Sequence, residues 1–392
     1  MDLGKAGSPW SLPANVSAPQ QPELPGRCDV VVAGAGVFGA TTALLLARRG
    51  LSVVLVDAGD PLQKSTTAHP TAKVTAAQGT LPARIAARHN DETAMQYLRA
   101  TQMAMAFVAT TSANAVTRAD QFVYGEDADS IAEVLETARL LRASGVTLAD
   151  APPDLPWPAT GYCVPDQMSL HPGEYLRDVI SAAEQNGALY LPRHPMTSFS
   201  GRGPVRVVAG DSEVRAGHLV LATHYPPTLR GGWFATLSAE RHFALLVSSP
   251  RATSAMTHLV GPTSRSTRPV GTDQMVVVGE GHPTGTSPGQ PWLTLEQWVV
   301  DRFGPIRVIA HWAAQDTFNV ADSLPIAGPV TPGSSVFAAA GFSGWGLTNG
   351  TIAAHQISAR VLGEPDPSWG DWGPRLPGMR AAGRLVKHQA AV

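Results

Sequence analysis

One stretch, residues 29–57, constrains the fold of this chain more than any other. A short apolar segment, residues 30–33, runs into Gly34-Ala35-Gly36-Val37-Phe38-Gly39. A helical pattern follows to residue 49, and a second apolar segment then ends on Asp57. This order of strand, glycine turn, helix, strand and acid is typical of a dinucleotide-binding unit.

Each part of the unit has a physical role. Gly34 permits the tight turn, Gly36 lets the backbone approach a pyrophosphate, and Gly39 allows close packing of helix and strand. The N-terminus of the helix offers unpaired N–H groups to phosphates. Asp57 can accept hydrogen bonds from the adenosine ribose of either NAD or FAD. A glycine pattern alone is weak evidence in a chain with 38 glycines, so the surrounding order carries the prediction.

Length and composition limit the kinds of protein that this chain can be. A chain of 392 residues, 44% of them hydrophobic, has room for about two domains with a substantial core. The 29 basic residues nearly balance the 31 acidic ones, so the charge gives no indication of a nucleic-acid partner. We find no apolar run long enough to span a membrane and no secretory signal pattern. We therefore expect a cytoplasmic protein with no membrane partner.

The sequence gives little support for a metal site or for a catalytic nucleophile. The two cysteines, Cys28 and Cys163, cannot build a cysteine-rich metal site, and we expect both to be reduced. A G-x-S-x-G match occurs at residues 285–289. Its Ser287 precedes Pro288, which has no N–H to line an oxyanion hole. We interpret it as a loop.

Helical and strand patterns alternate along the chain. Helices are predicted at residues 37–49, 81–108, 130–143, 174–185, 293–303 and 348–362. Strands are predicted at residues 52–57, 188–191, 205–209, 212–215, 218–223, 241–249, 274–279, 308–314 and 336–340. A second glycine-rich turn, Gly341-Phe342-Ser343-Gly344-Trp345-Gly346, joins the last predicted strand to the last helix. Both ends of the chain thus share a strand, a glycine turn and a helix start.

Four stretches carry a resemblance to a known family. Besides the opening unit, they are Thr66-Thr67-Ala68-His69-Pro70-Thr71-Ala72-Lys73-Val74-Thr75, residues 165–226, and residues 312–350 with GFSGWGLTNG. Together they resemble the FAD-dependent oxidoreductases of the D-amino-acid-oxidase superfamily, which includes glycine and sarcosine oxidases. The chain is most similar to the branch that often carries a C-terminal Rieske domain. No cysteine follows Cys163, so we expect no Rieske cluster within this chain.

The resemblance implies an α/β plus α+β fold. A Rossmann-like, glutathione-reductase-like FAD-binding domain would comprise residues 27–80, 160–228 and 315–365. An interleaved substrate domain with a mixed or antiparallel sheet would comprise residues 81–159 and 229–314. Residues 1–26 would form an irregular arm, and residues 366–392 a C-terminal tail.

The resemblance also implies which residues hold FAD. The second turn would lie at the flavin, where a helix N-terminus stabilises negative charge. Lys73 would lie near the ring, as an ammonium that tunes its potential or its reoxidation. FAD is expected to be non-covalent, with attachment through His69 as the alternative. The expected cofactor-binding residues are Gly34, Gly36, Val37, Phe38, Gly39, Asp57, Ala58, Thr66, Thr67, His69, Lys73, Met196, Gly341, Gly344, Trp345, Gly346, Leu347 and Thr348.

The implied activity is oxidation of a C–H bond beside nitrogen, in an amine or amino acid, by hydride transfer to flavin N5. Dioxygen or a separate acceptor would reoxidise the flavin. The candidate catalytic residues are Lys73, Gln315, Asp316, Trp345, His282 and Tyr225. Trp312 and His224 are further pocket candidates, and Arg241 and Arg84 are candidates for a carboxylate clamp.

Three alternatives stay open. The first is FAD-dependent oxidation of a hydroxyl-bearing carbon. The second is an NAD(P)-dependent dehydrogenase that uses the opening unit alone, which leaves the second glycine turn unexplained. The third is a flavin-bearing partner subunit without catalysis.

Overall fold

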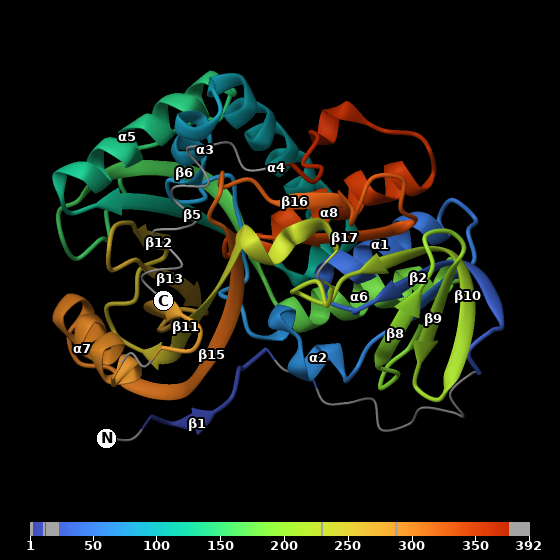
Figure 1. Cartoon of the computed structure of the whole chain (residues 1–392). Helices are drawn as coiled ribbons and strands as arrows, with labels where there is room; N and C mark the ends of the chain where they lie inside the picture. The colour runs from blue at the N-terminus through green and yellow to red at the C-terminus, as the bar shows by residue number, and fades with distance from the viewer. Residues whose placement is uncertain (1–2, 11, 13–22, 229, 287–288, 376–392) are drawn as a thin grey trace.

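Two large sheets organise the described part of the chain in this computed structural model. The structure describes residues 3–10, 12, 23–228, 230–286 and 289–375. One sheet has eight strands and the other nine, and they lie in opposite halves of the molecule (Figure 1). The predicted mixed α/β and α+β fold is confirmed.

The eight-stranded sheet contains the opening unit. Its main path runs β16-β17-β10-β2-β3-β7, and β9 and β8 extend it antiparallel from β10. Its strands are β2 (Arg27–Ala33), β3 (Val53–Val56), β7 (Leu189–Leu191), β8 (Met196–Ser200), β9 (Val205–Ala209), β10 (Ser212–Leu221), β16 (Ile326–Pro329) and β17 (Val336–Ala340). β17, β10, β2, β3 and β7 are parallel, and helices cover them, which explains their nearly continuous apolar sequences.

The nine-stranded sheet is largely antiparallel. Its order is β1-β15-β11-β14-β13-β12-β5-β6-β4. Its strands are β1 (Lys5–Ala6), β4 (Lys73–Val74), β5 (Val116–Gly125), β6 (Thr160–Leu170), β11 (Leu237–Ser248), β12 (Met256–Leu259), β13 (Arg265–Val270), β14 (Gln274–Pro283) and β15 (Arg307–Asn319). Only the β1–β15 and β12–β5 pairs are parallel.

Helices cover both sheets. They are α1 (Val37–Ala47), α2 (Pro61–Lys64), α3 (Leu81–Arg88), α4 (Asp91–Thr111), α5 (Ala128–Ala143), α6 (Pro172–Gln185), α7 (Pro291–Phe303) and α8 (Gly346–Val361). Short 3-10 turns are η1 (Thr66–Ala68), η2 (Ala113–Ala115), η3 (Arg230–Ala235) and η4 (Pro367–Trp369). In Figure 1, α5 lies over β5 and β6, whereas α1, α6 and α8 lie together in the other half.

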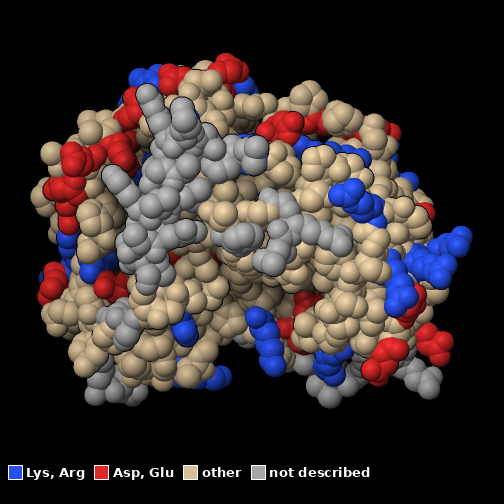
Figure 2. Space-filling view, viewed as in Figure 1, with Lys and Arg blue, Asp and Glu red and all other residues tan. Residues whose placement is uncertain are grey.

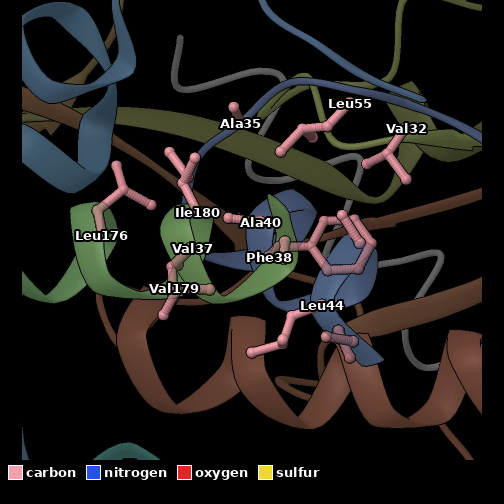
Figure 3. Close-up of a cluster of buried hydrophobic side chains, with 14 of the residues drawn as sticks. Val32, Ala35, Val37, Phe38, Ala40, Leu44, Leu55, Leu176, Val179 and Ile180 are labelled. Carbon is pink, nitrogen blue, oxygen red and sulfur yellow. The ribbon is translucent and has the colours of Figure 1, made fainter. Parts of the chain in front are cut away.

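Helix α1 is buried on nearly all sides, which explains its uniformly apolar sequence. It packs between the eight-stranded sheet and helices α6 and α8. Figure 3 shows Val179 and Ile180 of α6 in one apolar cluster with Val37, Phe38 and Leu44 of α1. This packing fixes the N-terminus of α1 relative to the sheet.

Several predicted boundaries differ from the structure. The helix predicted at residues 81–108 is wrong as one unit: it is α3 and α4, separated at residues 89–90. The chain breaks there because Asn90 caps α4, its side-chain oxygen accepting from the Thr93 N–H at 2.8 Å. Residues 73–74 and 160–170, expected in the FAD-binding domain, pair within the nine-stranded sheet as β4 and β6. The other domain ranges stay a prediction.

The arm and the tail are more ordered than expected where they are described. β1 pairs with β15, and the buried Trp10 donates from Nε1 to the carbonyl of Pro70 at 3.0 Å. Trp369 and Trp372 are buried against α4 and α8. The tail beyond residue 375 and Ser287-Pro288 of the G-x-S-x-G match lie outside the described residues.

The surface carries charges of both signs. Figure 2 shows basic and acidic side chains mixed around one face, without a large described region of either sign. Among the described residues, we find no helix long and apolar enough to span a bilayer, and no group of three or more metal-ligating side chains. Cys28 and Cys163 are buried free thiols.

Candidate functional site

A cavity of about 1210 Å³ lies between the two sheets. The residues that follow β2, β3 and β10 border it, because parallel strands end at the same edge of their sheet. The glycine turn before α8 borders it from a second direction, and the nine-stranded sheet forms the opposite wall. The volume exceeds the usual range for small-ligand pockets, about 300–1,000 Å³, and suits an extended dinucleotide.

The first glycine turn allows no side chain at two positions. Gly34 has φ +107°, and a Cβ there would lie 2.2 Å from the carbonyl oxygen of Ala222. A Cβ on Gly39 would lie 1.8 Å from the carbonyl oxygen of Gly34. The roles predicted for these glycines, a tight turn and close packing, follow from these contacts.

Asp57 and Thr67 fix the start of α1. The carboxylate of Asp57 accepts from the N–H of Ala35 at 2.7 Å and from the N–H of Gly59 at 2.9 Å. The hydroxyl of Thr67 accepts from the N–H of Val37 at 3.1 Å. The carboxylate retains acceptor capacity toward the cavity, since an ionised carboxylate has about four lone-pair sites.

The second glycine turn is anchored from two sides. The N–H of Gly341 donates to Thr317 Oγ1 at 3.0 Å, and the turn residue Gly344 has φ +79°. Behind the turn, Gln78 Nε2 donates to Thr348 Oγ1 at 2.8 Å, and Tyr97 donates to Gln78 Oε1. These bonds hold the first turn of α8 in place.

The residues at both turns fit FAD. A Cβ on Gly344 or Gly346 would meet nothing within 4 Å, so these positions present bare backbone to the cavity. The N-cap residue of α8, Trp345, provides no side-chain cap, which leaves the positive end of the helix for a ligand. The cavity joins this end to the Gly36 end of α1, and an extended ligand with a pyrophosphate near α1 and an electron-poor ring near α8 matches both.

A histidine and a carboxylate that line the cavity, His224 and Asp316, interact electrostatically. His224 follows β10 with φ +65°, and its Nδ1 lies 3.5 Å from Thr66 Oγ1. Burial lowers the pKa of His224, and Asp316 on β15 opposes that shift. Burial likewise raises the pKa of Asp316, and His224 opposes it. Each group therefore favours the charged form of the other.

The wall formed by the nine-stranded sheet is polar. Glu240 of β11 lies directly opposite Asp316 of β15 in the antiparallel register, and both line the cavity. His242 lies two residues along β11, with its Nε2 3.8 Å from Glu240 Oε2. His258 of β12 also lines the cavity, and its ring lies 5.9 Å from that of Trp345.

Lys73 is buried in the same wall, on β4. Its Nζ donates to the carbonyl of Thr257 at 2.8 Å and to Ser266 Oγ at 2.6 Å. Burial lowers its pKa well below the usual range, and Arg268 adds to the effect. Burial therefore disfavours the charged form of Lys73, which the sequence analysis had expected near the flavin. The side chain still donates hydrogen bonds to Thr257 and Ser266.

Most residues expected from the sequence meet at this cavity. Those that line it are Gly34, Gly36, Val37, Phe38, Gly39, Asp57, Ala58, Thr66, Thr67, His69, Lys73, Arg84, Met196, His224, Gln315, Asp316, Gly344, Trp345, Gly346 and Leu347. Gly341 belongs to the turn behind them, and Thr348 is buried within α8 with its hydroxyl bound to Gln78.

Three expected pocket residues lie elsewhere. The side chain of Tyr225 packs against the far face of the eight-stranded sheet, because the left-handed residue His224 turns the chain. His282 stacks on Phe243 outside the cavity lining, because Glu280 has φ +55° and interrupts the strand alternation. Trp312 donates from Nε1 to the carbonyl of His69 at 2.9 Å, behind the cofactor loop. Arg241 is also absent from the lining.

The sequence missed Glu240, His242 and His258. Alternation along the strand predicted at residues 241–249 would have placed His242 on one face with Ala244. The strand of His258 is only four residues long, and no motif marks it.

Comparison with known proteins gives a family. A family model described as FAD dependent oxidoreductase matches residues 29–360. The Bacillus subtilis (strain 168) protein YhfW, named for a Rieske 2Fe-2S iron–sulfur protein, is 25% identical over 358 residues. The match covers 87% of this chain and 70% of that protein.

Solved structures share the fold. Glycine oxidase from Geobacillus kaustophilus superposes with a TM-score of 0.73 at 13% identity, covering 90% of this chain and all of that one (100%). L-proline dehydrogenase from P. horikoshii superposes with a TM-score of 0.74 at 16% identity, and the match covers 88% of this chain and 95% of that one.

Proposed function

Since the chain belongs to the FAD-dependent oxidoreductase family and is such an enzyme, we propose that it oxidises a C–H bond next to nitrogen in a small amine or amino acid. The single observation that carries this proposal is the shared cavity. It joins two helix N-termini, α1 after Gly36 and α8 after Trp345, to a polar wall from a second sheet.

The opening unit would hold the adenosine and pyrophosphate part of FAD. Asp57 would accept the ribose hydroxyls, and the bare backbone at Gly36 would approach the pyrophosphate. The turn at residues 341–346 would hold the flavin, with the positive end of α8 near its pyrimidine edge. When bound, FAD supplies the hydride acceptor, at its N5.

The protein's own groups bind and orient the substrate. The wall of Glu240, His242 and His258 would contact the substrate. An amine must lose a proton before it can give up a hydride, and His224 with Asp316 is a nearby pair that can hold one. A catalytic nucleophile is not required for this chemistry, in keeping with the sequence.

Relatives supply circumstantial support. Glycine oxidase and L-proline dehydrogenase, which share the fold, are both named for amino-acid substrates. One is named an oxidase and the other a dehydrogenase, so we leave both dioxygen and a separate acceptor as partners of this chain. The Rieske name of the Bacillus subtilis relative suggests a protein electron acceptor as one such partner.

An anaerobic substrate screen tests the proposal. Purified yellow protein is mixed with amines, amino acids and alcohols, and flavin absorbance is followed before air is admitted. We expect at least one amine or amino acid to bleach the flavin. Bleaching by alcohols alone would favour oxidation of a hydroxyl-bearing carbon. No bleaching by any amine or amino acid would contradict the proposal.

We propose that FAD is held non-covalently, with His69 as the only attachment point the cofactor loop suggests. His69 lines the cavity, and its Nδ1 lies 2.9 Å from the carbonyl oxygen of Ser65. Acid precipitation tests this: we expect the yellow colour to remain in the supernatant. Colour that stays with the pellet of the natural protein, but not of His69→Ala, would establish attachment there.

A further inference from the structure

The loop that leads into β4, residues 65–72, forms part of the cavity wall, and we call it the cofactor loop. Three consecutive carbonyl groups near its end, those of His69, Pro70 and Thr71, accept hydrogen bonds from side chains behind it. In that order, the donors are Trp312 Nε1 at 2.9 Å, Trp10 Nε1 at 3.0 Å and Arg268 Nη1 at 2.9 Å. None of these three donors is among the cavity-lining residues. They therefore position the loop from outside the site.

The end of the cofactor loop has an unfavourable backbone conformation. Ala72 has φ +61° and is buried. A residue with a Cβ stays in this left-handed region only where the surrounding structure imposes it. A buried carbonyl that loses its donor is also unfavourable. The three hydrogen bonds behind the loop therefore help to hold it in this shape.

Trp10 differs from the other two donors because it belongs to the N-terminal arm, residues 3–10, whereas they lie on β15 and β13. Its ring is buried, with the guanidinium of Arg268 4.6 Å from the ring centroid. The ring also packs edge-on against His171, the N-cap residue of α6, with 5.5 Å between centroids. Trp10 thus contacts the nine-stranded sheet, a helix of the other half of the molecule and the cofactor loop.

The arm is attached to the nine-stranded sheet at an exposed glycine. Directly after the β1–β15 pair, Gly7 donates its N–H to the carbonyl of His311 at 2.9 Å. Gly7 has φ +114°, and a Cβ there would meet nothing within 4 Å. A change in the backbone at Gly7 would therefore displace the arm without altering any residue that lines the cavity.

We propose that Trp10 is a positioning residue for FAD: through its hydrogen bond to Pro70, the N-terminal arm holds the cofactor loop against the bound cofactor. The proposal goes beyond the proposed amine oxidation, because it concerns the retention of FAD and holds whichever carbon is oxidised. Loss of this anchor lowers the fraction of protein whose loop is in the binding position. The apparent affinity for FAD falls by the same factor.

The test measures release of FAD from the holoenzyme in the absence of substrate. The holoenzyme is diluted, and the change in flavin fluorescence gives the release rate; titration of the apoprotein with FAD gives the dissociation constant. Trp10→Phe keeps an aromatic ring beside Arg268 and removes the N–H. Because the buried Pro70 carbonyl then lacks its donor, we expect about tenfold faster release and about tenfold weaker binding.

Gly7→Pro tests the arm from a distance. Proline cannot adopt φ +114° and has no N–H to donate to His311. Trp10 keeps its own contacts in this variant, so we expect a smaller acceleration of FAD release, of about threefold.

Trp157→Phe is the matched control. Trp157 also lies beside a guanidinium, that of Arg302, 5.1 Å from its ring centroid, but it packs against Phe303 of α7 and not against the cofactor loop. We expect this variant to lower the free energy of unfolding of the apoprotein and to release FAD at the natural rate.

Release of FAD at the natural rate from Gly7→Pro, or from folded Trp10→Phe, would overturn the proposal. So would an equal acceleration in Trp157→Phe, which would mean that general destabilisation, and not the arm, frees the cofactor. If Trp10→Phe yields no folded protein, the rate measured for Gly7→Pro decides. The proposed function fails separately, when no amine or amino acid bleaches the flavin.

Discussion

At the scale of the residue, Gly34 is the position where the sequence and the backbone are most tightly linked. We predict that Gly34→Ala lowers the free energy of unfolding by about 3 kcal/mol or more. Strain at positive φ and overpacking against the Ala222 carbonyl each cost about 1–3 kcal/mol. FAD affinity, measured by titrating the apoprotein, should fall more than tenfold.

Gly50→Ala is the matched control for this change. Gly50 also has positive φ, +82°, but a Cβ there would meet nothing within 4 Å. We expect it to cost about 1 kcal/mol and to leave FAD affinity unchanged. Equal losses in the two variants would mean that backbone conformation alone, rather than the close approach, constrains Gly34.

Residue identity did not determine which histidines face the cavity. His282 looked favourable because it follows a strand, yet the positive φ of Glu280 turns it onto Phe243. His242 and His258 carry the same chemistry and do line the cavity. Direction of a side chain depends on local backbone twists that composition does not reveal.

At the scale of the element, the first turn of α8 depends on a side chain from outside the helix. We predict that Gln78→Leu costs about 1–3 kcal/mol, because it removes the bonds to Thr348 and Tyr97 inside the core. Urea unfolding measures the loss, and the visible circular dichroism of bound flavin reports a displaced turn. Gln96→Leu, which removes an exposed bond to the Pro367 carbonyl, should cost less than about 0.5 kcal/mol; a similar loss would contradict the argument.

The contact between α8 and η4 predicts a pH dependence of stability. His355 of α8 stacks on Trp369, with ring centroids 3.9 Å apart, and burial lowers its pKa to about 4 although Asp366 opposes the shift. The unfolded chain protonates this histidine near its usual pKa of about 6.5. Its contribution is therefore complete above pH 6.5 and is lost as the pH falls toward 4.

The variant His355→Phe keeps the aromatic stacking and cannot titrate. Between pH 7 and pH 5, we expect the natural protein to lose about 2 kcal/mol more stability than this variant. Urea unfolding at both pH values measures the difference, in which the other histidines cancel. An equal loss in the two proteins would show that His355 titrates normally in the folded state.

At the scale of the whole molecule, the cavity lies between the two sheets and is lined by residues of both. Because FAD would contact both, its removal should destabilise the protein as a whole. At a free FAD concentration one hundred times the dissociation constant, binding adds about 2.7 kcal/mol. We predict a matching rise in the free energy of unfolding on adding FAD to apoprotein. No change, with FAD bound, would mean that FAD binds the unfolded chain equally well.

Long-range pairing explains the main errors made from the sequence. β4 and β6 sit in the nine-stranded sheet, although their sequences lie within stretches that resemble a cofactor domain. β1 and Trp10 join the fold through contacts some sixty or more residues away, at Pro70 and β15. Pairing of this kind depends on partners that are distant in sequence, so local patterns do not indicate it.

The sequence by itself determined the dinucleotide unit, the second glycine turn and the mixed fold class. The two glycine turns are local features: the first unit, from its strand to Asp57, occupies 29 consecutive residues, and the second turn occupies residues 341–346. Only the tertiary structure decided which other groups face the cofactor from the opposite wall. Beside Asp316, which the sequence analysis had proposed, Glu240, His242 and His258 line the cavity from β11 and β12, and strand register and the β-bulge between Arg241 and Phe243 set the direction of the β11 side chains. A shift of one residue in that register would turn each strand's side chains to the other face.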